Sequence, residues 1–172
     1  MARQRKKAGI LSMLFLGIIF TASGAAVVHF FGHDIYLEGS RDTGVCEITR
    51  VGLLGKSEVV ESFPVDRLQG ATVLRSKTSD GDSTYKVIIE TQDGSIPLTG
   101  YASSGRSKHD ANADKINAFA KGQSDVLSVK QSGTGIRIVG LLFAGIGLLM
   151  LLGFVWMLIK LVLALVLLAV SR

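Results

Sequence analysis

Histidine and acidic side chains gather where the first apolar segment of the chain ends. His29 and His33 are four residues apart, so their imidazoles would share one face of a helix, and Asp34 follows directly. Imidazoles and a carboxylate oxygen are ligands for zinc and related divalent metals. A structural site would need one more ligand, which folding would have to bring from Cys46 or His109. His29, His33 and Asp34 are therefore candidate metal ligands, with ordinary interfacial residues as the alternative.

Elsewhere the sequence assembles no catalytic group. No Ser, His and Asp combination has the turn context of a nucleophile elbow, and Gly133-Thr134-Gly135 is too short for a phosphate loop. Cys46 lies in an alternating segment, which favours a buried thiol over a redox or lipid-modified one. The acids Asp80 and Asp82 lie in a turn-rich loop. We therefore predict a non-enzymatic protein with no cofactor and no resident metal.

Two long apolar segments enclose the rest of the chain. They cover residues 10–31 and 138–170, and Lys160 is the one charged residue within them. About 20 apolar residues in a helix cross the roughly 30 Å hydrocarbon core of a bilayer. The sequence therefore predicts transmembrane helices over 10–31 and 138–159, with the lipid bilayer as a partner.

Lys160 leaves a short apolar stretch beyond the second predicted crossing. A lysine at the bilayer boundary can extend its ammonium group to the headgroups, so Lys160 is a predicted interfacial anchor, with charge pairing inside a complex as the alternative. Residues 160–172 form an apolar C-terminal extension. It could continue as a tilted helix, lie in the interface or pack against another subunit, but it is too short for another crossing.

The charges divide unevenly along the chain. All 14 acidic residues lie between Gly32 and Arg137, together with 13 of the 19 Lys and Arg residues. The folded part is therefore slightly acidic, and the pI of about 9.5 comes from the two ends, which argues against nucleic-acid binding.

The basic residues of the N-terminal tail, residues 1–9, predict the topology. They are Arg3, Arg5, Lys6 and Lys7. Basic residues beside a membrane helix stay in the cytoplasm. We expect both termini inside an inner or plasma membrane and the central domain in the periplasm or outside the cell. A cleaved signal peptide is the alternative for the first segment, but its apolar residues continue to Phe31, past the small residues 21–26.

Small side chains in both apolar segments could form helix contacts, because they permit close approach of membrane helices. In the first segment they form the pairs Thr21 with Ala25 and Ala22 with Ala26, and in the second they are Gly140, Gly145, Gly147 and Gly153. The contact could join the two helices to each other, to a second copy or to a partner subunit.

The central domain, residues 32–122, has the pattern of strands followed by one helix. Strands are predicted at 45–49, 56–63, 71–74, 85–91 and 95–99, with 35–38 the least regular, and Asp93-Gly94 predicts a hairpin turn. The apolar stripe of Ala113, Ile116 and Phe119 predicts an amphipathic helix over about 108–121, ended by Gly122. Residues 123–137 are expected to be a flexible linker.

This order of elements resembles the pleckstrin-homology-like (PH-like) partial barrel of some bacterial membrane proteins. The resemblance covers about residues 35–122 and is carried by the segments 63–68, 85–99 and 115–119. It implies a scaffold that binds lipids, peptides or neighbouring subunits, without an assigned activity. A simpler α+β domain is the alternative.

Family members that bind phosphoinositides use a basic cluster in one hairpin. Here Arg75, Lys77 and Lys86 flank the loop that contains Asp80 and Asp82. The two acids weaken any phosphate site, so solvated strand ends are the favoured interpretation.

Together these patterns predict a membrane α plus α+β protein that serves as an accessory or structural subunit of a membrane complex. The expected partners are integral membrane subunits or further copies of the chain, and no nucleic acid. One alternative is a lipid or small-ligand sensor that signals through the helices. Another is a minor membrane metal-binding protein or enzyme using His29, His33 and Asp34.

Overall fold

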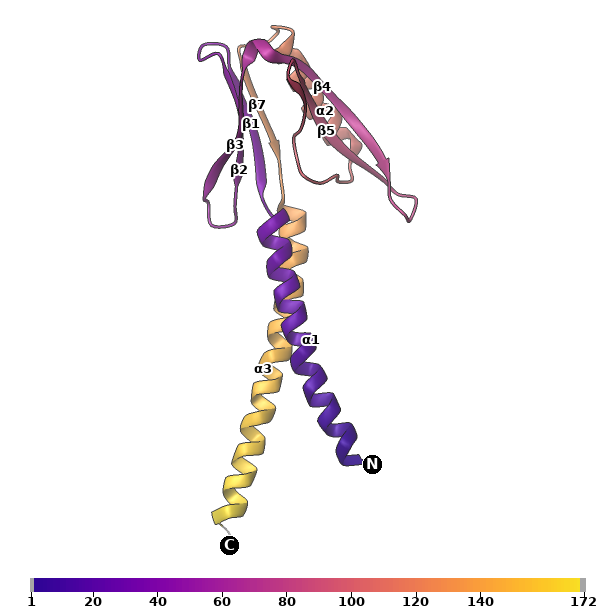
Figure 1. The fold of residues 1–172 in the computed structure, drawn as a ribbon, viewed down its shortest axis with the longest axis vertical. Helices are drawn as coiled ribbons and strands as arrows, with labels where there is room; N and C mark the ends of the chain where they lie inside the picture. Colours follow the sequence, from indigo (N-terminus) through magenta and orange to yellow (C-terminus); the bar gives the residue numbers. More distant parts are fainter. Residues whose placement is uncertain (1, 171–172) are drawn as a thin grey trace. The chain divides into compact units, whose positions relative to one another are not determined.

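The computed structural model describes the backbone of residues 2–170 and the side chains of residues 11–170. These residues contain three α-helices and two antiparallel sheets, an α+β architecture (Figure 1). Contacts divide the described residues into a helical unit, residues 2–30 and 135–170, and a β-domain, residues 31–134. The side chains of the basic N-terminal tail lie outside the described ones, so their role in topology stays a prediction.

The helical unit consists of α1 (Ala2–Phe31) and α3 (Thr134–Val170). Both are long and apolar enough to cross a membrane: an 18-residue stretch within Leu11–Phe31 has a mean hydropathy of 2.1, and one within Thr134–Val170 has 2.7. Only the length and the composition of the helices support a membrane location, so the membrane assignment stays a proposal. α3 continues without a break past Lys160, and the described part of the C-terminal extension is therefore helical.

The β-domain contains seven strands in two sheets. The first sheet has the order β3-β2-β1-β7 and comprises β1 (Asp34–Ser40), β2 (Val45–Val51), β3 (Ser57–Pro64) and β7 (Val126–Gln131). The second has the order β4-β5-β6 and comprises β4 (Leu68–Lys77), β5 (Ser83–Thr91) and β6 (Gly94–Pro97). A 3₁₀ turn, Val65–Arg67, joins the sheets, and α2 (Arg106–Ala120) follows β6.

The β5–β6 hairpin and α2 confirm two predictions from local pattern. β5 and β6 pair through Thr91 and Gly94, and Gly94 has a φ of 137°, a conformation that favours glycine. α2 ends at Ala120, and Gly122 terminates it as expected: its amide donates to the Phe119 carbonyl at 3.0 Å. With the Gln123 amide on the Ala118 carbonyl at 2.9 Å, this is a Schellman ending.

The prediction of a flexible linker over 123–137 is wrong. β7 lies within it and pairs with β1 along six residues, from Ser40 with Val126 to Ile35 with Gln131. Leu127 and Val129 alternate with polar residues and are buried, which is the period of a half-buried strand. The domain therefore ends on a strand, and its helix lies before that strand rather than after all of them.

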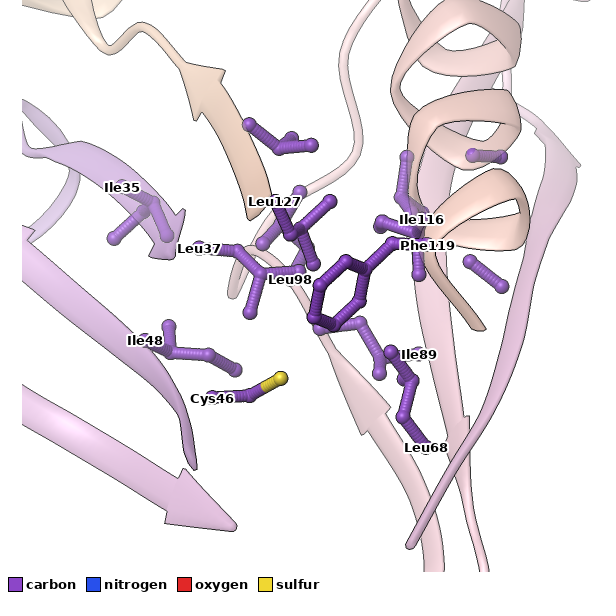
Figure 2. Close-up of a cluster of buried hydrophobic side chains, with 14 of the residues drawn as sticks. Ile35, Leu37, Cys46, Ile48, Leu68, Ile89, Leu98, Ile116, Phe119 and Leu127 are labelled. Atoms are coloured by element: carbon purple, nitrogen blue, oxygen red, sulfur yellow. The ribbon is translucent and has the colours of Figure 1, made fainter. Parts of the chain in front are cut away.

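A single apolar core lies between the two sheets and α2. Phe119 of α2 occupies the middle of the cluster that Figure 2 shows. Its most buried members are Leu37, Cys46 and Ile48 of the first sheet, Val87 and Ile89 of the second, Ile116 and Phe119 of α2, and Leu127 and Val129 of β7.

Cys46 is part of this core. A Cβ atom added at Gly39 would lie 2.7 Å from the Cys46 Sγ atom, so the thiol fits only because its neighbour has no side chain. Burial raises the pKa of the Cys46 thiol to about 11, although the nearby charge of Arg41 acts in the opposite direction. The thiol is therefore protonated at neutral pH and shielded from reagents.

Asn117 fastens α2 to the open edge of β4. Its Oδ1 atom accepts from the Ala71 amide at 2.8 Å, and its Nδ2 atom donates to the Ala71 carbonyl at 3.0 Å. Ala71 is buried, so both backbone groups would otherwise lack a partner at a sheet edge. The side chain thus takes the place of a neighbouring strand.

Replacing Asn117 with Ala should therefore destabilise the β-domain by about 1–3 kcal/mol, the cost of leaving buried polar groups unsatisfied. Asp114→Ala on the exposed side of α2 is the control and should change stability by no more than about 0.5 kcal/mol. Thermal unfolding of the full chain in detergent, followed by circular dichroism, measures both. Equal stability of the two variants would contradict a role for this contact.

Candidate functional site

The two helices of the helical unit pack antiparallel through small residues. We call these residues the helix seam: Gly17, Thr21 and Gly24 of α1, and Gly140, Ala144 and Gly147 of α3. Both sets follow the same spacing of four and then three residues, so each set keeps one face toward its partner. The helices are therefore joined through two matching seven-residue patterns.

The backbones approach so closely that side chains would not fit in the seam. A Cβ atom added at Gly24 would lie 2.5 Å from the Gly140 carbonyl oxygen, and one at Gly140 would lie 2.9 Å from the Gly24 carbonyl oxygen. Larger side chains cover the two ends, where Val28 packs on Gly140 and Leu151 on Gly17. Beside the seam, the rings of Phe20 and Phe143 stack with centroids 5.5 Å apart.

Some of the glycines of α3 predicted to pack lie in the helix seam, and others lie outside it. Gly140 and Gly147 lie in the seam and are the buried residues of α3. Gly153 lies against the Met13 side chain, with 2.8 Å between its added Cβ and Met13 Cε. Nothing lies within 4 Å of a Cβ added at Gly145.

On α1 the structure differs from the expectation. Of the four predicted residues, Thr21 lies in the seam, whereas Ala22, Ala25 and Ala26 are exposed. Gly17 and Gly24 make the other close contacts. Sequence reasoning missed these two glycines because it followed pairs at a spacing of four. Their interval of seven residues, repeated by Gly140 and Gly147, was the signal that could have found them.

In the β-domain, Asp34 links the two ends of the domain. Its Oδ1 atom accepts from the Gly133 amide at 2.9 Å and from Ser132 Oγ at 3.3 Å. Its Oδ2 atom lies 3.3 Å from Lys130 Nζ. Hydrogen bonds to Tyr36 and then to Asp34 raise the pKa of the Lys130 ammonium group. We call these contacts the Asp34 clamp; they hold the first and last strands together where the chain enters and leaves the domain.

The structure does not assemble the candidate metal ligands. His29 belongs to the helical unit and His33 to the β-domain, and the Asp34 carboxylate is occupied by the clamp. Cys46 packs on Gly39, and His109 lies beside Ser103. Among the described residues, no group of three His, Cys, Asp or Glu side chains could hold a metal.

His109 belongs to a buried polar network that sequence reasoning considered only as a chance metal ligand. It is 2% exposed, and its Nε2 atom lies 3.0 Å from Ser103 Oγ. Gln131 donates to the same oxygen at 3.4 Å and accepts from Asn112 at 3.3 Å. The His109 Nδ1 atom has no hydrogen-bond partner among the described residues. This network joins α2 to β7 and to the segment before α2.

Burial lowers the pKa of His109, while a hydrogen bond with the Ser103 backbone and the charge of Asp110 act in the opposite direction. The Tyr85 ring lies 6.3 Å away, centroid to centroid. A cationic imidazole would have little solvation in these surroundings. The site therefore favours a neutral imidazole with a structural role.

Arg41 covers the C-terminal end of α2. Its guanidinium group donates to the Phe119 carbonyl and to the Ser124 carbonyl, the latter at 3.2 Å, and lies 5.0 Å from the centre of the Phe119 ring. A cation is favourable at this end of a helix. An open hollow of about 440 Å³ lies beside it, lined also by Val65 and Asp66.

The basic residues of the β4–β5 hairpin do not form one cluster. Arg75 pairs with Tyr85, whereas Lys86 pairs with Leu74, so Arg75 and Lys86 project from opposite faces of the sheet. The Arg75 guanidinium group donates to Ser83 Oγ at 2.8 Å. This arrangement supports the interpretation as strand ends rather than a phosphate site.

The helix seam predicts a sharp difference between two glycines of α3. Gly147→Val places a side chain against the Thr21 backbone and should destabilise the helix pair by about 1–3 kcal/mol. Gly145→Val makes the same change where nothing lies within 4 Å and is the matched control. Disulfide formation between cysteines introduced at Phe20 and Phe143 measures the pairing. Equal cross-linking in the two variants would contradict the seam.

His109 predicts a loss of stability in acid. Its pKa in the folded protein lies below the ordinary 6.5, so the unfolded chain binds more protons as the pH falls below that value. Stability is therefore fully present above about pH 6.5 and falls by up to about 1.4 kcal/mol per pH unit until the folded pKa is reached. Thermal unfolding of the full chain in detergent between pH 7.5 and pH 5 tests this.

His109→Gln should flatten that dependence, and His29→Gln, a change at an exposed histidine of α1, should leave it in place. The histidine assignment is wrong if both variants lose stability in acid as the unchanged protein does.

Comparison with known proteins gives no match: no family model, no curated protein and no solved structure is significantly similar to the chain. Function must therefore be inferred from the helix seam, the Asp34 clamp and the surfaces that the two units leave open.

Proposed function

We propose that the protein is a non-enzymatic, membrane-anchored accessory or structural subunit, whose extracytoplasmic β-domain and helices mediate assembly of a membrane complex. The observation that carries this proposal is the uncovered apolar surface of the helices. α3 has 37 residues, and Gly140 and Gly147 are its buried ones. Its large side chains, such as Leu149 and Trp156, are exposed. Such a surface requires lipid or another apolar helix as its neighbour.

The polar residues of α3 support the placement of its C-terminal part at a membrane boundary. The Lys160 Nζ atom lies 5.4 Å from the centre of the Trp156 ring, and both residue types are favoured at the interface. At 1.5 Å per residue the helix is about 55 Å long, well beyond the roughly 30 Å core of a bilayer. The apolar turns after Lys160 would then extend on the cytoplasmic side and offer a surface to a partner subunit.

Ala22 and Ala26 provide a second surface for assembly. They are exposed on α1, and at about 100° per residue they lie on the side opposite Gly17 and Gly24 of the seam. Small residues allow a partner helix to approach closely. The chain thus uses one small-residue face internally and leaves another for a second copy or a partner.

We extend the proposal to the fold of the β-domain, as a variant of the PH-like partial barrel. Seven strands divided into sheets of four and three, with one helix on the core, support it. The position of α2 before β7 departs from the order that the resemblance implies. Fold alone assigns no activity.

A ligand sensor is the second candidate. The hollow beside Arg41 has about 440 Å³, within the roughly 300–1,000 Å³ of small-molecule sites. It places a cation and the carboxylate of Asp66 beside apolar Val65 and Leu68. Thermal stabilisation of the full chain by a lipid or small molecule would favour sensing over assembly.

Purification of the tagged full chain from its native membranes in mild detergent tests the assembly proposal. We expect a particle larger than the detergent-bound monomer, containing further copies or other membrane proteins. Ala22→Leu/Ala26→Leu should reduce this association because it fills the exposed small-residue face, whereas Ser23→Leu at the neighbouring exposed position should not. A strictly monomeric protein without co-purifying subunits would count against the proposal.

A further inference from the structure

The β2–β3 loop (Gly52–Lys56) displays two leucines to solvent in a closed turn. Leu54 is 95% exposed and Leu53 is 52% exposed. The Gly52 amide donates to the Lys56 carbonyl at 2.9 Å, and the Gly55 amide donates to the Gly52 carbonyl at 3.1 Å. The leucines are therefore held outward by a hydrogen-bonded hairpin. An apolar pair fixed in this way indicates a surface that receives it.

The loop lies at the end of the domain where the chain enters and leaves. Val51, the last residue of β2, pairs with Asp34, the first residue of β1. The Asp34 clamp brings Gly133 to the same place. A Cβ atom added at Gly52 would lie 3.8 Å from the His33 ring. Figure 1 shows the β2–β3 turn at the same end of its sheet as the start of β1 and the end of β7.

Short connectors tie this end of the domain to both apolar helices. Gly32 and His33 separate α1 from β1, and Ser132 and Gly133 separate β7 from α3. Two residues span at most about 7 Å. If the helices cross a bilayer, as the proposed function requires, the end of the domain that carries the loop cannot lie far from the lipid surface.

The charges around the loop suit a lipid surface. Arg50 and Lys56 flank the leucines and both are exposed, and no acidic residue lies between them in the sequence. Glu58 pairs with Arg50 in the register of β2 and β3, on the strand side of the loop. An apolar tip between basic residues can bury its leucines among acyl chains while its cations stay with the headgroup phosphates.

We propose that the β2–β3 loop inserts Leu53 and Leu54 into the outer surface of the bilayer, with Arg50 and Lys56 among the headgroups, and thereby docks the β-domain on the membrane. This inference rests on the proposed membrane anchoring. It goes further in assigning a lipid contact to the domain itself.

A fluorescent label on the loop tests the inference in the full chain. Leu54→Cys is labelled with the environment-sensitive dye NBD before reconstitution into vesicles of phosphatidylethanolamine and phosphatidylglycerol. The matched control is Val126→Cys, which is 64% exposed and pairs with Ser40 at the opposite end of the same sheet. Cys46 is fully buried, so the unsubstituted protein serves as the unlabelled blank.

The expected result is a blue shift of the Leu54→Cys label and loss of its fluorescence to doxyl-labelled lipids, with neither effect at position 126. Solvent-like emission from both labels, in a protein that floats with the vesicles, overturns the loop contact and leaves the anchoring intact. A blue shift without doxyl quenching also overturns it, because the loop then contacts protein. Protein that does not float with the vesicles refutes the anchoring and the inference together.

Discussion

The contact between the Asp34 carboxylate and the other end of the β-domain is the constraint on which the rest of the structure depends. It joins residues 99 positions apart, since the Gly133 amide donates to Asp34. The carboxylate is nearly buried and is satisfied by two donors and the ammonium group of Lys130. Because the first and last strands end together, the connectors to both apolar helices begin at neighbouring points.

Polar groups inside the β-domain fix the positions of its strands and of α2. Asn117 replaces a strand at the edge of β4, His109 and Gln131 share the Ser103 hydroxyl, and Arg41 covers the end of α2. Burial of apolar side chains favours a compact domain but is not directional. Hydrogen bonds are directional, so those at these sites determine how α2 is oriented on the edge of β4 and against the neighbouring segments. Asp34 and His109, which suggest reactivity in the sequence, make hydrogen bonds of this kind, and Cys46 is buried in the apolar core.

The outward surfaces show the opposite character. The helices keep small residues for each other and expose their large apolar side chains, and the β2–β3 loop exposes two leucines at the connector end of the domain. Exposing so much apolar surface to water would be unfavourable, and soluble proteins rarely do so. These exposed groups, rather than a pocket, are the observations that support the proposed membrane setting and the proposed assembly.

The sequence by itself determined the elements that local pattern encodes. Long apolar runs, the alternation in β5 and the Gly122 ending predicted α1, α3, the β5–β6 hairpin and the end of α2, because these depend on neighbours a few residues away. Tertiary structure decided that 126–131 is a strand, that Gly17 and Gly24 form the seam in place of Ala22 and Ala26, and that Lys86 lies on the face opposite Arg75. It also decided that Asp34 joins the two ends of the domain rather than a metal site. Each of these depends on register between distant segments, which no single segment of the chain contains.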